Sequence, residues 1–171
     1  MKVQLKGFDE YILKLTALEG KSDEIAKKAL YEGAKVIADA VKENIKTLPT
    51  EKARWLDNDK GEKYNVCTPQ QKDAISNGFG ISHMENDADG FNLKVGFDTV
   101  GYVVYSGNKY KFTSKYPTGM PIPMLVRSIE HGSSVRQKHP FVRPVIVSHR
   151  KEAKLKMQET VDTEVKEIMK G

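Results

Sequence analysis

The feature that most constrains the fold is a long stretch of helical periodicity in the first third of the chain. In the run EIAKKALYEGAKVIADAVKENIKTL, residues 24–48, apolar side chains recur mostly every three or four positions. This spacing forms one stripe along an α-helix, so the helix needs a partner that covers the stripe. Pro49 cannot continue the helix. Gly33 costs about 1 kcal/mol relative to Ala inside a helix, and we interpret it as a close crossing with another element. The apolar positions include Ile25, Ala29, Ile37, Val41 and Ile45.

A second long amphipathic helix is predicted at the end of the chain, over residues 144–170. Apolar residues repeat there at mostly four-residue steps, with charged residues between them. Pro144 suits the first turn of a helix, where a missing N–H costs nothing. The apolar positions are Ala153, Met157, Val161, Val165 and Ile168.

Three shorter helices are expected. Residues 8–18 have helical spacing, and Glu19-Gly20 should end that helix. In residues 69–77, Thr68 can cap the helix and Gly78 can stop it. A third short helix, PMLVRSIEH, ends before the glycine of the following turn.

The middle of the chain predicts β structure. FGISHMEN and FNLKVGFD are strand-like runs joined by DADG, a turn containing Asp-Gly, and together they indicate a β-hairpin. YVVY is a candidate third strand, and the alternation in MKVQLK indicates a short strand at the start. We therefore expect an α+β fold. In it, a small antiparallel sheet with a β-hairpin packs against a long helix in the N-terminal half and a long C-terminal helix.

Composition supports one ordinary globular domain over residues 1–171. Hydrophobic residues make up 39% of the chain and charged residues 30%, and no apolar run approaches a membrane span. The start of the sequence has no stretch suited to a signal peptide, so we expect a protein that stays in the cytoplasm where it is made. The net charge of +5 allows weak attraction to nucleic acid or to an acidic partner. The lysines are nevertheless scattered among acids, unlike the basic face of a dedicated DNA reader.

Two segments are candidate contact surfaces. Residues 49–66 have no clean period and are predicted to be an inserted flexible loop, in which Trp55 either tucks back onto the domain, as we favour, or meets a partner. Residues 101–120 are rich in tyrosine. Within them, lysines alternate with Tyr110 and Tyr116 across residues 109–116. Stacking on aromatic rings beside cations is one way to bind single strands. An alternative hypothesis is therefore a small nucleic-acid-binding module that uses this Lys/Tyr loop.

No pattern predicts catalysis, a metal site or a cofactor. The four histidines include no pair at metal-ligand spacing on a helix, and no phosphate-binding loop or nucleophile motif occurs. DADG resembles part of a calcium loop, but Gly96 stands where a bidentate glutamate is needed. Cys67 is the lone cysteine, and we expect it to be an unreactive, partly buried thiol. The sequence therefore predicts a protein that is not an enzyme. The histidines are His83, His131, His139 and His149.

The densest stretch precedes the C-terminal helix. SIEHGSSVRQKHPFVRPVI reads as a short helix, a Gly-Ser turn, and a proline-flanked motif that enters the long helix. Gly132 permits a turn that other residues resist, while Pro140 and Pro144 each restrict one backbone angle. Phe141 is expected to anchor the joint in the core. Arg136 and Arg143 could pair with carboxylates, either within the fold or across a subunit boundary.

This stretch resembles the HPFxRPA-like motif of the gene-product-ten-like family of HK-type tailed bacteriophages. The opening MKVQLKGFDEYILKL, the ALYEGAKVIADAVKENI helix and TPQQKDAISNGFGI are similar to earlier parts of that family, and residues 49–66 look like an insertion. Val145 stands where the family often has Ala.

The resemblance implies a minor virion protein of the neck, which joins head to tail or completes the tail. Family members are thought to form rings through which double-stranded DNA passes without being read. The expected partners are therefore other copies of the chain, other neck, head-completion or tail-tube proteins, and DNA in the lumen, but no membrane. The location implied is the virion, after synthesis and assembly in the host bacterial cytoplasm. The candidate interaction residues are Arg136, His139, Phe141, Arg143, Trp55, Tyr110 and Tyr116.

Overall fold

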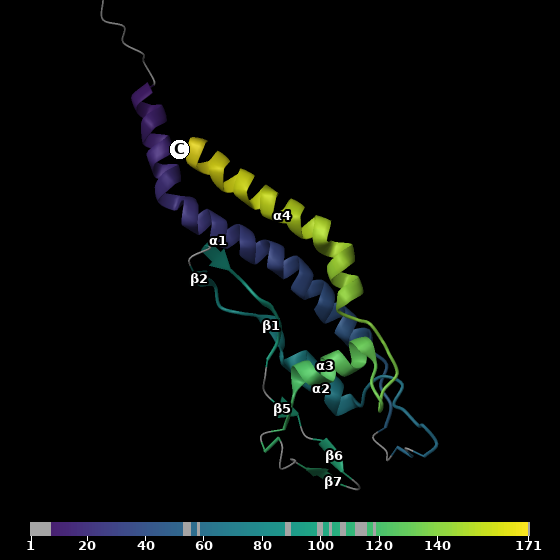
Figure 1. The fold of residues 1–171 in the computed structure, drawn as a ribbon. Helices are drawn as coiled ribbons and strands as arrows, with labels where there is room; N and C mark the ends of the chain where they lie inside the picture. Colours follow the sequence, from purple (N-terminus) through teal and green to yellow (C-terminus); the bar gives the residue numbers. More distant parts are fainter. Residues whose placement is uncertain are drawn as a thin grey trace, which may run out of the picture.

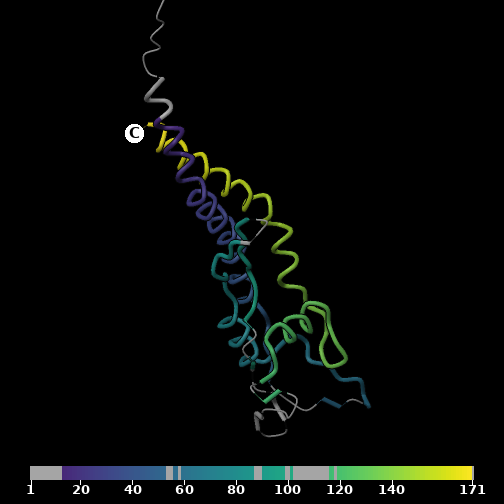
Figure 2. Tube along the Cα trace, turned by 60° about the vertical axis from the view of Figure 1, so that its left-hand side comes forward, coloured from purple at the N-terminus to yellow at the C-terminus, as the bar shows by residue number. Residues whose placement is uncertain are grey.

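Two long helices run side by side and extend beyond a more compact end of the molecule (Figures 1 and 2). The first, α1, spans Phe8–Thr47, and the last, α4, spans Arg143–Lys170. The α+β fold predicted from the sequence is confirmed. The computed structural model describes residues 8–52, 56–57, 59–87, 90–98, 101–102, 104–106, 109–111, 116–117 and 119–170.

The expected break after residue 18 is wrong, because α1 continues as one helix of 40 residues. A Cβ added at Gly20 would meet no atom of another element within 4 Å, so the glycine has no packing role there, and the helix tolerates it at about 1 kcal/mol relative to Ala. The helix bends within its purple N-terminal part (Figure 1). The short strand predicted in MKVQLK lies outside the described residues.

The apolar stripe of α1 packs against α4 along one part of its length and against the main core along another. Ala29 is buried and lines a hollow together with Met157 and Val161 of α4, whereas Val41 and Ile45 are 1% exposed in the core. Gly33 is the crossing point with α4: a Cβ there would lie 2.4 Å from the Met157 Cγ and 3.2 Å from the Ala153 carbonyl oxygen. The interpretation of Gly33 as a close crossing is therefore confirmed.

The predicted hairpin is present and lies along the side of α1 opposite α4 (Figure 1). Its base pairs β1, Phe79–Ile81, with β4, Val95–Phe97, and its tip pairs β2, Glu85–Asp87, with β3, Gly90–Asn92. Both ladders are antiparallel, with Phe79 opposite Phe97 and Asp87 opposite Gly90.

The candidate third strand is found as two pieces that pair away from this hairpin. The first, β5, Gly101–Tyr102, pairs with β8, Met120–Pro121. The second, β6, Val104–Ser106, pairs with β7, Lys109–Lys111. Among the described residues, every sheet is therefore a short, two-stranded antiparallel ladder.

The main core lies at the C-terminal end of α1, where the short helices and the hairpin base converge. Helix α2, Pro69–Asn77, begins with the predicted Thr68 cap, and Gln71 completes a capping box. Helix α3, Ile122–His131, contributes Leu125 and Ile129 to the core. None of the helices in the described part of the chain is long and apolar enough to cross a bilayer.

The described part of the 49–66 segment is tied to the core at its ends. The Glu51 N–H donates to the Cys67 carbonyl at 2.9 Å, and Val66 is buried. Tyr64 exchanges backbone hydrogen bonds with the turn that follows α3, through Val135 and Gln137. Whether the segment is flexible stays a prediction.

Candidate functional site

The stretch between α3 and α4, residues 132–142, forms a joint that we call the elbow. It begins at Gly132, whose φ of 78° lies in a region that favours glycine. A Cβ at Gly132 would also lie 3.2 Å from the Lys138 backbone nitrogen. Ser133 and Arg136 then close a tight turn through paired backbone hydrogen bonds, and the His139 N–H donates to the Ile129 carbonyl at 2.7 Å. The elbow is therefore fixed by backbone contacts at both ends.

Glu130, in the last turn of α3, holds the start of α4. One carboxylate oxygen accepts from the N–H groups of Phe141 at 2.8 Å and Val142 at 3.0 Å, and the other accepts from Arg143 at 2.9 Å. The first N–H groups of a helix have no partner within it, and the positive end of the helix dipole favours an anion. A carboxylate from the preceding helix thus caps α4.

The environment of Glu130 has opposing effects on its pKa. Burial raises the pKa of the carboxyl, but the three N–H donors and the charge of His131 outweigh it. The pKa of Glu130 therefore lies below its ordinary value, and the ionised cap is the stable form in the fold.

Arg136 joins the elbow to the segment before α2. Its side chain is 4% exposed, and its guanidinium donates to the Val66 carbonyl and, at 3.1 Å, to the Gln71 amide oxygen. The guanidinium also lies 5.6 Å from the centre of the Tyr64 ring. Because Gln71 belongs to the capping box of α2, this one arginine links the elbow to a helix start and a loop.

Phe141 anchors the elbow in the core, as predicted. Its side chain is 1% exposed, and its ring meets the Phe97 ring edge to face with centroids 6.4 Å apart. Its backbone is held on both sides, because Glu130 accepts from its N–H and Asn44 of α1 donates to its carbonyl at 2.5 Å. The phenylalanine of the HPFVRP motif thus connects α1, α3, α4 and the hairpin.

The remaining candidate residues are not brought together. Arg143 is exposed and makes no ion pair with the described residues, so a carboxylate partner across a subunit boundary stays a prediction. His139 is half-buried and contributes its backbone to the elbow. The half-buried Tyr116 donates its hydroxyl to the Met124 sulfur at 3.5 Å. Trp55 and the Tyr110 side chain lie outside the described residues, although the Tyr110 backbone belongs to β7.

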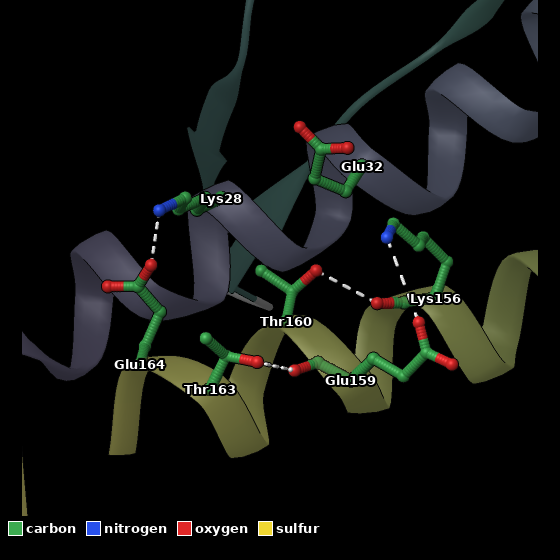
Figure 3. Close-up of a pocket in the computed structure, with 7 residues that line it drawn as sticks. All are labelled: Lys28, Glu32, Lys156, Glu159, Thr160, Thr163 and Glu164. Atoms are coloured by element: carbon green, nitrogen blue, oxygen red, sulfur yellow. Dashed lines mark hydrogen bonds and ion pairs between the residues drawn. The ribbon is translucent and has the colours of Figure 1, made fainter. Parts of the chain in front are cut away.

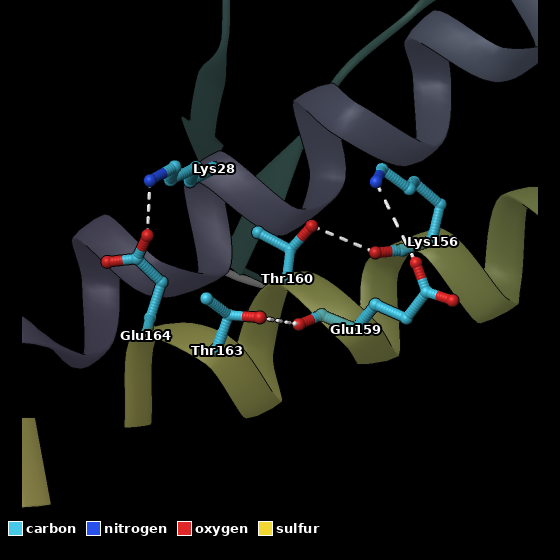
Figure 4. A network of polar contacts seen from close by, with 6 residues as sticks. All are labelled: Lys28, Lys156, Glu159, Thr160, Thr163 and Glu164. Atoms are coloured by element: carbon cyan, nitrogen blue, oxygen red, sulfur yellow. Dashed lines mark hydrogen bonds and ion pairs between the residues drawn. The ribbon is translucent and has the colours of Figure 1, made fainter. Parts of the chain in front are cut away.

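A polar hollow of about 260 Å³ lies between α1 and α4, far along the helix pair from the elbow (Figure 3). Lys28 of α1 and Glu164 of α4 form an ion pair across it. The Thr160 and Thr163 hydroxyls donate to carbonyls one turn earlier in α4, at 2.8 and 2.7 Å (Figure 4). The hydroxyls and charges are thus used by the helices themselves, and the hollow is best described as a polar seam.

Possible metal ligands and the thiol of Cys67 are the other groups considered in the described part of the chain. No three His, Cys, Asp or Glu side chains converge as metal ligands in the described ranges. Cys67 is fully buried, its thiol lies 3.6 Å from the Pro49 carbonyl oxygen, and burial raises the pKa of the thiol. A thiol with a raised pKa is a poor nucleophile near neutral pH.

Sequence reasoning missed Glu130 as the central group of the elbow. One signal was available: α4 starts after Phe141 and Val142, neither of which can accept a hydrogen bond with its side chain. A helix start without a local capping residue needs an acceptor from elsewhere in the chain, and Glu130 is the acidic residue just before the turn.

Comparisons with protein-family models, with curated proteins and with solved structures found no match for this chain.

Proposed function

We propose that the chain is a structural subunit of a phage or prophage neck, which joins head to tail or completes the tail as a ring around double-stranded DNA. The proposal rests on the resemblance of the HPFVRP stretch to the gene-product-ten-like family. The observation that carries it is the elbow, in which that motif supplies a buried anchor and a capped helix start. Assembly would place the chain in the virion, after synthesis in the host cytoplasm.

A rigid elbow suits this role because ring closure depends on angles within the subunit. In a ring, each copy uses two different surfaces, and the rotation between neighbours must close. In this chain, the direction of α4 is fixed by contacts to α1 and α3 through Phe141 and Glu130. A helix whose direction is fixed can present a contact surface to a neighbour at a reproducible angle.

The helix pair also carries exposed apolar side chains that a neighbour could cover. Leu155 of α4 is 58% exposed, and Leu13 of α1 is 70% exposed. Scattered exposed apolar residues are common on protein surfaces. They support assembly here only together with the elbow and the resemblance.

Negative-stain electron microscopy of the purified chain, alone and with a tail-tube protein, tests this function. We expect closed rings with one subunit number and a central opening. Light scattering after gel filtration should give a mass that is a whole multiple of the 19.2 kDa chain. A monomer that stays monomeric at high concentration and with the tail-tube protein argues against the proposal.

A further inference from the structure

We infer that one face of α4 binds the phosphate backbone of double-stranded DNA without reading its sequence. This face, which we call the basic face, consists of Arg143, Val147, Arg150, Lys151 and Lys154. At 3.6 residues per turn, positions 143, 147, 150, 151 and 154 lie on one side of a helix. All five residues are exposed.

The charge of α4 changes along its length. The first half, residues 143–156, has five basic residues and one acidic residue, whereas residues 157–170 have four acidic and two basic residues. The scattered lysines noted in the whole sequence thus include a local concentration next to the elbow. In Figure 1, α4 lies on the side of α1 away from the hairpin.

The fold does not neutralise the basic face. None of its four cations has an acidic residue three or four positions away on the helix, and no described carboxylate lies within ion-pair distance of them. Glu130, at the start of α4, is engaged with backbone N–H groups. Arg150 and Lys154, four apart, repel one another and slightly destabilise the helix. A bound polyanion would remove that repulsion.

Lysines of α1, by contrast, have acidic neighbours. On α1, Lys35 has Asp39 four positions later, and Lys42 has Asp39 three positions earlier. Lys28 is paired with Glu164. These cations belong to a mixed surface, so they provide a matched control for the basic face.

The chemistry of the basic face favours nucleic acid over an acidic protein. Protein interfaces usually centre on apolar or aromatic anchors and are poor in charge at the centre, whereas Val147 is the only apolar member here. The face is about 17 Å long, since eleven residues separate its ends. The same length of duplex carries roughly ten phosphate charges, so four cations can each meet one. No side chain of this set suggests base reading.

The inference deepens the proposed function, because it identifies the face of each subunit that would meet DNA in the lumen. It can be measured on the purified chain whether or not a ring forms. Rings without DNA binding would contradict this inference and leave the proposed function standing. DNA binding without rings would contradict the proposed function and leave this inference standing.

Fluorescence anisotropy with a random-sequence duplex tests the inference. If all four cations contact phosphates, log K should fall with log salt with a slope of about −3.6 per chain. The double substitution Arg150→Glu/Lys154→Glu should weaken binding about tenfold or more and reduce the slope by about 2. The neutral variant Arg150→Gln/Lys154→Gln should also weaken DNA binding and reduce the salt slope. Circular dichroism checks that its helix content is unchanged.

The control Lys35→Glu/Lys42→Glu changes the net charge by the same amount and should leave the affinity within about threefold. Equal losses in the two charge-reversed variants would show a bulk charge effect and overturn the inference. Competition by polyglutamate as strong as that by DNA would point to an acidic protein instead. A loss in Tyr110→Ala as large as in the α4 variants would assign binding to the Lys/Tyr loop, and would equally overturn it.

Discussion

At the residue scale, Glu130 has the most consequential chemistry in the described chain. A buried carboxylate is costly unless its charge is balanced, and here three backbone N–H groups and a helix dipole balance it. Hydrogen bonds to a charged acceptor are stronger than neutral ones. One side chain therefore fixes the end of α3 to the start of α4.

We expect Glu130→Gln to destabilise the fold by about 2 kcal/mol or more, because the charge is lost and an amide N–H₂ faces backbone donors. Chemical denaturation at neutral pH measures this change. Glu152→Gln, an exposed change on α4, should stay within about 0.5 kcal/mol. Equal effects of the two substitutions would be inconsistent with a capping role for Glu130.

The same carboxylate predicts a pH dependence of stability. Because the folded-state pKa of Glu130 is lowered, its contribution is fully present above the ordinary value of 4.5 and is lost as the pH falls through the lower folded-state value. The free energy of unfolding should therefore fall more steeply below pH 4.5 in the wild type than in Glu130→Gln. Parallel curves for the two proteins would count against the assignment.

Phe141 shows what the sequence could and could not predict at this scale. Proline-flanked apolar residues beside a helix start indicate an anchor, and the structure confirms one. The role of Glu130 was not predictable in the same way, because its partners are backbone groups eleven to thirteen positions away. A sequence pattern can show that a helix start lacks a local capping side chain, but it does not show which distant acceptor reaches the N–H groups.

We expect Phe141→Ala to cost about 3–5 kcal/mol, since a fully buried ring leaves a cavity against Phe97. Val147→Ala, at a site 70% exposed, is the control and should be nearly neutral. Thermal and urea unfolding of both variants provide the measurement. A loss below 1 kcal/mol for Phe141→Ala would show that the elbow is not anchored in the core.

At the element scale, the α1–α4 crossing explains why the glycines of α1 differ. Gly33 touches α4, and Gly20 faces open space. Both glycines lower the helix propensity of α1, but only Gly33 allows α4 to approach α1 closely. The sequence predicted the crossing at Gly33 but wrongly predicted a break at Gly20. A glycine within a helical pattern gives the same sequence signal whether or not another helix packs against it.

Substitution of the two glycines should therefore have opposite effects. Gly20→Ala should stabilise the fold by about 1 kcal/mol through helix propensity. Gly33→Leu should destabilise it by roughly 1–3 kcal/mol, because its side chain would overlap Met157 and the Ala153 carbonyl. Urea denaturation compares the two. A stabilising Gly33→Leu would show that the helices do not meet there.

At the scale of the whole molecule, a compact core end continues into a slender two-helix arm (Figures 1 and 2). The long helices and the hairpin could be predicted, because periodicity and turn residues are local signals. The pairing of β5 with β8 could not, since it joins segments separated by a long tyrosine-rich stretch. The route of the chain through the elbow gives the arm its direction, and the proposed assembly depends on that direction.

The most direct test is a comparison of assembled particles from the wild type and Glu130→Gln, by negative-stain electron microscopy at matched concentration and neutral pH. Circular dichroism first confirms that both proteins are folded. We expect closed rings of one symmetry for the wild type and open or irregular oligomers for the variant. Rings of identical symmetry from both proteins would contradict the claim that the capped elbow sets the geometry of assembly, and an absence of rings from the wild type would contradict the assembly itself.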